Sequence, residues 1–250
     1  MNCHGKCQGS AVVYEDDGAD EPVVVCHCRQ CRTWSGHRWA SSAEPAARFR
    51  LAEERGLCRF QSSGGERRGF CGTCGTSLFW QKASDRICFS ARSLDGPTGL
   101  EVARGMCVAE ATAGPTADLL EAGCMCGAVR FALPGPAGEV EACHCNQCRK
   151  MSGHFAASFD VEKGLVRYEA RDGLAEFRSA NGGTRGFCSK CGSSLWFRAA
   201  DGEFSVKVGA VKGDAVGPVT CHIFVADKGG YFRIGDEAPQ FAGNGEAEGL

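Results

Sequence analysis

Cys143-His144-Cys145-Asn146-Gln147-Cys148 places three thiols within six residues, a spacing typical of cysteines that chelate one metal ion. The same pattern occurs earlier as Cys26-His27-Cys28-Arg29-Gln30-Cys31, at an offset of 117 residues. The offset holds for other cysteines without a gap: it relates Cys7 to Cys124, Cys71 to Cys188 and Cys74 to Cys191. The chain is therefore a tandem duplication.

The repeat divides the 250 residues into two units of somewhat over a hundred residues each. We expect a first domain at 1–112, a linker at 113–121, a second domain at 122–243 and a flexible tail at 244–250. Short apolar runs separated by glycine-rich turns, with 35 glycines in all, favour a mainly β architecture of small coiled antiparallel sheets.

Several short segments have the composition of strands. Val23–Val25 leads into the first cysteine cluster, Ser77–Trp80 and Arg86–Ser90 are expected to form a hairpin, and Leu195–Phe197 and Phe204–Val208 repeat that hairpin in the second unit. The pattern from Arg48 to Phe60 fits an edge strand or a helical turn, and Glu15-Asp16-Asp17-Gly18 predicts a turn.

The charge and the termini exclude some classes of function. The chain has 28 basic and 30 acidic residues, without a run of like charges, which weakens a nucleic-acid interpretation. The N-terminus has no apolar signal region, and no segment approaches the roughly 20 apolar residues of a membrane span. The 18 cysteines in close clusters therefore favour metal coordination in a reducing, cytoplasmic compartment, with a secreted disulfide framework as the alternative.

Two distant pairs of thiols form the first ligand set of the second unit. Cys124-x-Cys126 and Cys188-x-x-Cys191 together offer four thiolates, the complement of a closed tetrahedral zinc site. Four thiolates leave no open position, so we expect a structural role in which metal binding contributes to folding. The alternative is two unrelated pairs of core cysteines.

The three thiols of the hexapeptide form the second ligand set. Cys143, Cys145 and Cys148 cannot complete a tetrahedron from their own loop, and a zinc ion with three protein ligands keeps a position for water or substrate. Three thiolates make zinc a weaker Lewis acid than three histidines do, which favours a thiol substrate. A fourth protein ligand would close the site instead, and Cys221 and His222 are the candidates.

The remaining histidines and cysteines have simpler interpretations. His144 is interpreted as a solvated turn residue and not as a ligand; His37 and His154 are interpreted as packed or surface residues and not as proton-transfer groups. Four cysteines have no cysteine at the offset position and are interpreted as small buried residues. These four are Cys58, Cys88, Cys107 and Cys221.

Motifs along the second unit resemble a known family. They are Cys124-Met-Cys-Gly-Ala-Val-Arg-Phe131, Cys143-His-Cys-Asn-Gln-Cys-Arg-Lys-Met-Ser-Gly153, Phe187-Cys-Ser-Lys-Cys-Gly-Ser193, His222-Ile-Phe-Val225, Lys228 and Ala238-Pro-Gln-Phe241. In this order they resemble the glutathione-dependent formaldehyde-activating enzyme (GFA, or CENP-V/GFA) domain, whose fold is the Mss4-like β-tent. The resemblance implies a structural zinc at Cys124, Cys126, Cys188 and Cys191 and a catalytic zinc at Cys143, Cys145 and Cys148.

The resemblance also implies an activity, which is the reversible addition of glutathione to formaldehyde to give S-hydroxymethylglutathione, a carbon-sulfur lyase-type reaction. Two zinc ions per domain, up to four per chain, would be the cofactors. Arg149 and Lys150 follow the last ligand and are candidates for binding a substrate carboxylate, with a solvated basic pair as the alternative. His222 is a candidate for proton transfer.

The first unit departs from this pattern. Gly9 stands at the position of Cys126, so Cys7, Cys71 and Cys74 lack one ligand, and Cys3 or, as second choice, His4 is the nearest replacement. Gly105 stands at the position of His222. Because Cys26, Cys28 and Cys31 are intact, we expect the first unit to bind metal. We also expect it to support the second unit in an intramolecular pseudo-dimer, with the chemistry mainly in the second unit.

Two other functions remain open from the sequence. One is a non-catalytic, zinc-stabilised binding or scaffold protein of the same superfamily, with every metal site closed. The other is an enzyme with the same site that acts on a different thiol or aldehyde. Binding of nucleic acid or microtubules is disfavoured by the pI of about 6.3.

Overall fold

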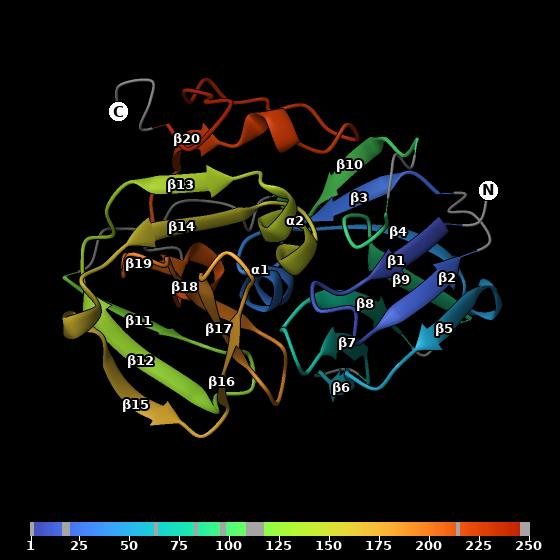
Figure 1. Ribbon diagram of the computed structural model, residues 1–250, viewed down its shortest axis with the longest axis horizontal. Coiled ribbons are helices and arrows are strands. Elements are labelled where there is room, and N and C mark those ends of the chain that lie inside the picture. Colours follow the sequence, from blue (N-terminus) through green and yellow to red (C-terminus); the bar gives the residue numbers. More distant parts are fainter. Residues whose placement is uncertain are drawn as a thin grey trace.

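The computed structural model describes residues 3–16, 21–62, 65–82, 85–95, 99–108, 118–213 and 216–245, with all their side chains except that of Cys3. The chain forms two halves, which we define as residues 3–108 and 118–245 and which lie side by side in Figure 1. Residues 113–117 of the expected linker and 246–250 of the expected tail lie outside the described residues, and both domain limits stay predictions.

Short strands make up most of each half. The first half contains β1 (Cys3–Lys6), β2 (Val13–Asp16), β3 (Val23–Cys26), β4 (Trp39–Pro45), β5 (Phe49–Glu53), β6 (Leu57–Gln61), β7 (Arg67–Cys71), β8 (Ser77–Gln81), β9 (Arg86–Ser90) and β10 (Val102–Met106). The second half contains β11 (Leu119–Gly123), β12 (Val129–Pro134), β13 (Val140–Cys143), β14 (Ala156–Asp160), β15 (Arg167–Arg171), β16 (Leu174–Arg178), β17 (Thr184–Cys188), β18 (Ser194–Arg198), β19 (Phe204–Lys207) and β20 (Val219–Ile223).

The two halves repeat one sheet topology. Each has a three-stranded sheet, β1-β2-β5 or β11-β12-β15, and a seven-stranded sheet, β10-β3-β4-β9-β8-β7-β6 or β20-β13-β14-β19-β18-β17-β16. The pairings are antiparallel except at one edge, where β10 runs parallel to β3 and β20 runs parallel to β13. The duplication and the mainly β class of small sheets are thereby confirmed.

One short α-helix in each described half starts inside a cysteine cluster. In α1 (Arg29–Ser35) the sulfur of Cys28 caps the helix by accepting from the Cys31 N–H, and in α2 (Asn146–Ser152) the sulfur of Cys145 does the same for the Cys148 N–H. Both helices end at a glycine in the left-handed region, Gly36 or Gly153. The 3₁₀ turns are η1 (Ala46–Arg48), η3 (Lys163–Leu165), η4 (Val208–Ala210) and η5 (Val225–Asp227).

Each half has its own apolar core, built from alternating strand residues that face inward. In the second half the core includes Phe131, Phe159, Leu195 and Trp196, and in the first half it includes Tyr14, Leu78 and Phe89. Cys188 and Cys191 belong to the core of the second half, and Cys7, Cys71 and Cys74 belong to that of the first. These five ligands are therefore packed into the folded structure, whereas Cys126 is exposed.

The halves contact each other through equivalent elements. Phe187 of the second half packs against Gly75 of the first, and Phe70 packs against Gly192 in return, in both cases at a glycine with positive φ where an added Cβ would clash with the ring. Helix α1 contacts η4, and the Gly209 N–H donates to the Gly36 carbonyl at 2.8 Å. The junction is therefore close-packed, and two helices lie near its centre (Figure 1).

The structure settles the local expectations. Strands β8 and β9 pair antiparallel, as do β18 and β19, so both expected hairpins are confirmed. The ambiguous stretch from Arg48 to Phe60 is mostly extended, because β5 pairs with β2 and β6 pairs with β7, while Arg48 itself ends η1. The expected turn at Glu15 is wrong for its first two residues, since Glu15 and Asp16 lie within β2; residues 17–18 lie outside the described residues.

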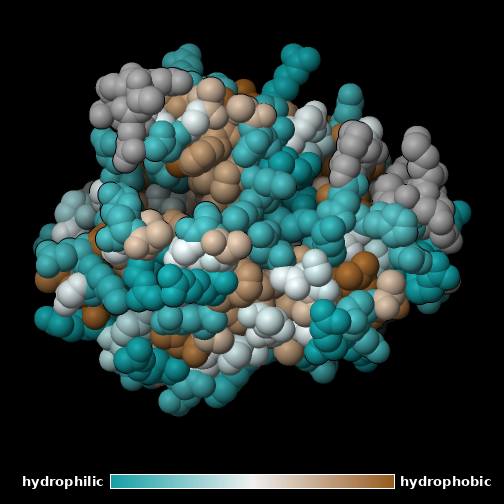
Figure 2. Space-filling model, in the orientation of Figure 1, coloured by the Kyte–Doolittle hydropathy of each residue, from teal (hydrophilic) through white to brown (hydrophobic). Residues whose placement is uncertain are grey.

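The surface in Figure 2 is largely hydrophilic, and its hydrophobic atoms form several separate patches on this face. Among the described residues, no helix has both the length and the apolar character needed to cross a membrane.

Candidate functional site

Cysteine sulfurs gather at four places in the described residues, and within each group all the sulfurs lie within 4.8 Å of one another. Each half carries two groups. They are Cys124, Cys126, Cys188 and Cys191; Cys7, Cys71 and Cys74; Cys143, Cys145 and Cys148; and Cys26, Cys28 and Cys31. No disulfide links any of the cysteines whose side chains the structure describes.

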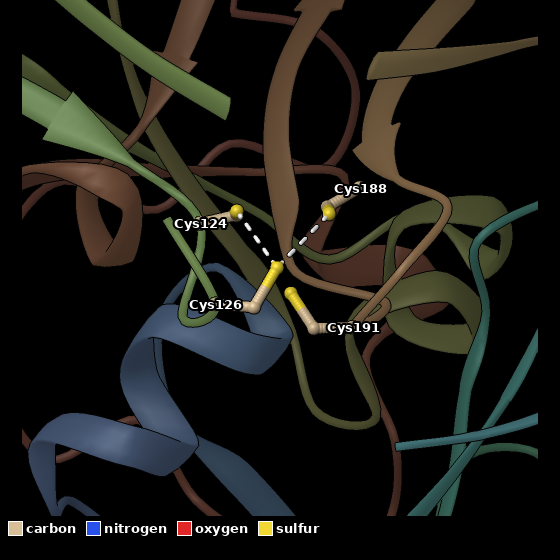
Figure 3. Close-up of side chains that lie close together, drawn as sticks. All are labelled: Cys124, Cys126, Cys188 and Cys191. Carbon is tan, nitrogen blue, oxygen red and sulfur yellow. Dashed lines mark hydrogen bonds between the residues drawn. The ribbon is translucent and has the colours of Figure 1, made fainter. Parts of the chain in front are cut away.

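Figure 3 shows the first group, here called the four-thiol site, with its side chains converging from two turns. Cys124 and Cys126 follow β11, Cys188 is the last residue of β17, and Cys191 lies in the turn between β17 and β18. The sulfur of Cys126 is 3.5 Å from that of Cys124 and 3.7 Å from that of Cys188, and the Val129 N–H donates to the Cys124 sulfur at 3.2 Å. Four converging sulfurs with a backbone N–H donor fit a tetrahedral zinc ion.

The corresponding group of the first half has three described ligands. Cys7, Cys71 and Cys74 are all buried, and Gly9 leaves the fourth corner without a thiol. His4 does not supply it, because its ring is largely exposed and lies 3.9 Å from Glu15. The side chain of Cys3, the other candidate, lies outside the described residues, so its role stays a prediction.

Cys143, Cys145 and Cys148, here called the Cys143 cluster, lie where β13 passes into α2. The described residues place no fourth His, Cys, Asp or Glu ligand atom within 4.8 Å of all three sulfurs, so neither Cys221 nor His222 closes the group. Hydrogen bonds from Cys143 and Cys145 hold the pKa of the Cys148 thiol well below its usual range, and Lys207 and Arg185 act in the same direction. The thiolate that a metal requires is thus favoured at this position.

A chain of hydrogen bonds extends from the middle of this cluster. The Nε2 atom of His144 lies 2.9 Å from Nδ1 of His222, whose Nε2 atom lies 2.9 Å from Oδ1 of Asp236. His144 is fully buried between Phe155 and Phe232, and this burial, with His222 next in importance, lowers its pKa to about 4. The interpretation of His144 as a solvated turn residue is therefore wrong.

Tertiary pairing explains this error. A histidine between two cysteines of a tight loop gives no local sign of burial, but β20 runs parallel to β13 and aligns His222 with Ala142, next to Cys143. Asp236 was not identified from the sequence, where an acidic residue in the closing segment carries no distinguishing signal.

Cys26, Cys28 and Cys31, here called the Cys26 cluster, occupy the equivalent place in the first half. Hydrogen bonds from Cys26 and Cys31 hold the pKa of the Cys28 thiol well below its usual value. The guanidinium of Arg68, which stacks over Trp34, lies 3.9 Å from the Cys31 sulfur. All three cysteines line a cavity of about 680 Å³, which nothing in the sequence pattern predicted.

Arg149 and Lys150 are already engaged by protein groups. The Arg149 side chain is buried, which lowers its pKa to about 10, and it donates to Asn146 Oδ1 at 3.4 Å. The ammonium of Lys150 lies 2.9 Å from Asp95 of the first half. Their assignment to a substrate carboxylate stays a prediction, which for Lys150 requires the Asp95 pair to open or to be shared.

Two further histidines lie buried between the halves. The ring of His37 of the first half packs in a tilted arrangement against Phe155 of the second, with the ring centroids 5.1 Å apart. His154 contacts the same ring and hydrogen-bonds to the Tyr231 hydroxyl. Both side chains are buried, so of the two alternatives given for them, packed or surface residues, the structure shows packed residues. Of the four cysteines without a counterpart at the repeat offset, Cys221 is buried, Cys58 and Cys88 are partly buried and Cys107 is exposed, so the expectation of burial is wrong for Cys107.

Comparisons with known proteins agree on one family. The sequence model of the family described as "Glutathione-dependent formaldehyde-activating enzyme" matches residues 2–101 and, a second time, residues 119–227. A protein of Halomonas elongata named "Putative glutathione-dependent formaldehyde-activating enzyme" is 37% identical over 91 residues, which are 31% of this chain and 55% of that protein. The chain thus spans about half the length of this curated relative.

A crystal structure of a Rhodobacter sphaeroides protein is also similar to part of the chain. The TM-score is 0.35 at 21% identity, and the match covers 48% of this chain and 98% of that one.

Proposed function

The chain belongs to the family of glutathione-dependent formaldehyde-activating enzymes, and from this premise we propose that it adds glutathione reversibly to formaldehyde at the Cys143 cluster. The thiol sulfur bonds to the carbonyl carbon, and the π electron pair of the C=O bond moves to oxygen. The oxygen gains one proton and the thiol loses one. The product is S-hydroxymethylglutathione, and the reverse reaction is a carbon-sulfur bond cleavage.

One observation carries this proposal. Three sulfurs converge in the Cys143 cluster, and the described residues offer no fourth ligand atom within 4.8 Å of all of them. A zinc ion held there would lower the pKa of a thiol at its remaining position and hold that sulfur for attack. The same observation disfavours a scaffold protein in which every metal site is closed.

The histidine chain would handle the proton. Asp236 accepts from His222, which fixes the tautomer of that ring and leaves its Nδ1 atom for exchange with His144. Phe155 and Phe232 cover His144, so water is kept from one side of the proton path. Addition of a thiol to formaldehyde needs little beyond positioning and proton transfer, which are the tasks these side chains could perform.

The first half would support this site. Lys150 pairs with Asp95 of the other half, close to the contact of Gly153 with Trp39. A phenylalanine of each half also packs against the equivalent glycine of the other half. We propose that they form an intramolecular pseudo-dimer with two zinc ions per half, where the first half completes its structural site with Cys3.

Metal analysis of two variants tests the proposal. Wild type should hold about four zinc ions per chain and the Cys145→Ser variant about three, by the ligand rule for zinc. The variant should keep its fold and lose turnover of glutathione and formaldehyde. The control is the Cys58→Ser variant, which changes a cysteine outside all four groups and should keep both its fold and its turnover. Loss of the fold in Cys145→Ser would show that this cluster is structural.

A further inference from the structure

The cavity of about 680 Å³ in the first half has a wall unlike that of the equivalent region in the second half. The three residues of the Cys26 cluster line this cavity, and the apolar part of the lining includes Trp39, Trp80 and Met106. A volume in this range suits a small organic molecule. The position of the sulfurs means that a ligand in this cavity would reach a metal held by the cluster.

The repeat shows which lining residues make the wall of this cavity apolar. Val24 and Ala43 of the first half correspond at the offset to Glu141 and Asp160 of the second. The strand registers agree, since Ala43 faces Cys88 across β4 and β9 while Asp160 faces Ser205 across β14 and β19. Two acidic positions of the second half are therefore apolar in the first.

The cavity lining includes the charged side chains of Glu21, Arg29, Glu66, Arg68 and Arg104, of which at least three have protein partners. Glu21 pairs with Arg86, Arg68 donates to the Gln30 side chain at 3.2 Å, and Glu66 accepts from Ser62 at 3.4 Å. These contacts lower the capacity of the wall to bind an extended polar tripeptide, whereas the two indole rings can pack against an apolar body.

We infer that this cavity binds a thiol with an aromatic or branched apolar body, whose sulfur points to the Cys26 cluster. The inference shares with the proposed function the premise that a three-thiol cluster holds zinc. The two halves would then be two sites with different substrate preference, a polar thiol in the second and an apolar thiol in the first. Ala43 and Val24 would be the residues that determine the specificity of the first site.

Calorimetric titration of the zinc-loaded full chain with phenylmethanethiol tests the inference. We expect binding that is about tenfold or more weaker in Ala43→Asp, because a carboxylate in the apolar wall must lose its hydration. The matched control is Asp160→Ala, the reverse exchange in the second half, which should leave this binding unchanged. Both substitutions introduce a residue that the same fold already accepts at the equivalent position.

Two further probes separate the sulfur from the apolar body. Phenylmethanol has the ring without the thiol, and 2-mercaptoethanol has the thiol without the ring. We therefore expect the affinity of each to be at least about tenfold lower than that of phenylmethanethiol. Equal binding of phenylmethanol would overturn the role of the Cys26 cluster, and equal affinity of wild type and Ala43→Asp would overturn the role of the wall.

The inference and the proposed function can fail separately. Cys145→Ser should abolish turnover of glutathione and formaldehyde and keep the binding of phenylmethanethiol, whereas Cys28→Ser should lose that binding and about one zinc ion. Loss of phenylmethanethiol binding in Cys145→Ser with Cys28→Ser unaffected would place the apolar thiol in the second half and contradict the inference. Ala43→Asp, which alters no ligand, decides the case if Cys28→Ser does not fold.

Discussion

At the scale of single residues, His222 occupies a defined position between two partners. Its ring bridges the buried imidazole of His144 and the half-exposed carboxylate of Asp236, so its tautomer is set by the two contacts together. The neighbouring cysteines supply sulfur ligands only, and an imidazole is the side chain best suited to transfer a proton near neutral pH. Function at this scale therefore depends on groups that lie outside the metal-ligand motif.

We expect His222→Gln to lower kcat for glutathione and formaldehyde about 100-fold, the usual size of a general acid-base contribution. Asp236→Asn should lower kcat less, because it changes the ring's tautomer and keeps the ring. The control is Glu237→Gln, a change of the adjacent exposed carboxylate, and zinc content should stay at the wild-type level in all three. An unchanged kcat in His222→Gln would remove the histidine chain from the mechanism.

Replacement of one sulfur in the four-thiol site should act on stability. Cys126→Ser removes the ligand that lies between Cys124 and Cys188, so we expect a loss of about one zinc ion per chain and a marked fall in Tm. Elemental analysis and thermal unfolding would measure the two effects on one sample. A variant with full zinc content and unchanged Tm would show that these cysteines are ordinary core residues.

At the scale of elements, α2 is short and its two ends are fixed by special residues. The sulfur of Cys145 caps its first turn, and Gly153 ends it at φ 82° against Trp39 of the other half. Such a helix has too few turns to be stable alone, so its caps and its tertiary contacts position the Cys143 cluster. The last ligand, Cys148, lies on this helix.

Gly153→Ala should destabilise the protein by about 2–4 kcal/mol, since the left-handed backbone disfavours a side chain and the added Cβ would lie 2.6 Å from Trp39 Cδ1. Urea unfolding monitored by fluorescence would measure the change. Gly138→Ala, where the added Cβ meets no atom within 4 Å, should stay within about 0.5 kcal/mol of wild type. Equal effects of the two substitutions would contradict the role of the cap.

At the scale of the whole molecule, the junction between the halves buries histidines together with aromatic rings. Burial holds the pKa of His37 well below its usual range, with Arg38 as the next cause, and neither ring nitrogen of His37 has a hydrogen-bond partner in the described structure. Such a group stays neutral in the folded state while the unfolded chain takes up a proton. The junction is therefore sensitive to acid.

The sign of this effect gives a prediction. Below a pH of about 6.5 the unfolded state gains a proton at His37 that the folded state does not bind, so the free energy of unfolding should fall by up to about 1.4 kcal/mol per pH unit from this residue. His37→Gln should make the slope between pH 6.5 and pH 5.5 shallower by a similar amount. The exposed His4→Gln is the control, and equal slopes in wild type and His37→Gln would contradict the prediction.

The amino-acid sequence alone determined the duplication, the mainly β class, and the grouping of the cysteines. The duplication and the two three-thiol clusters follow from local spacing, because three thiols within six residues necessarily lie close together. The four-thiol site, which joins Cys126 to Cys188 over 62 positions, was predicted from its ligand count. The two hairpins were predictable from local spacing, because their arms are adjacent in the chain.

Only the tertiary structure decided the surroundings of those sulfurs. Parallel pairing of β20 with β13 aligns His222 with Ala142 and brings its ring against His144, and pairing of β10 with β3 places Met106 at the cavity of the Cys26 cluster. His144 meets His222 across 78 positions, Arg68 meets Cys31 across 37 and Asp236 meets His222 across 14, and no local pattern encodes these contacts. The ligands were thus readable in the chain, while the groups that would act on a substrate were assembled by long-range packing.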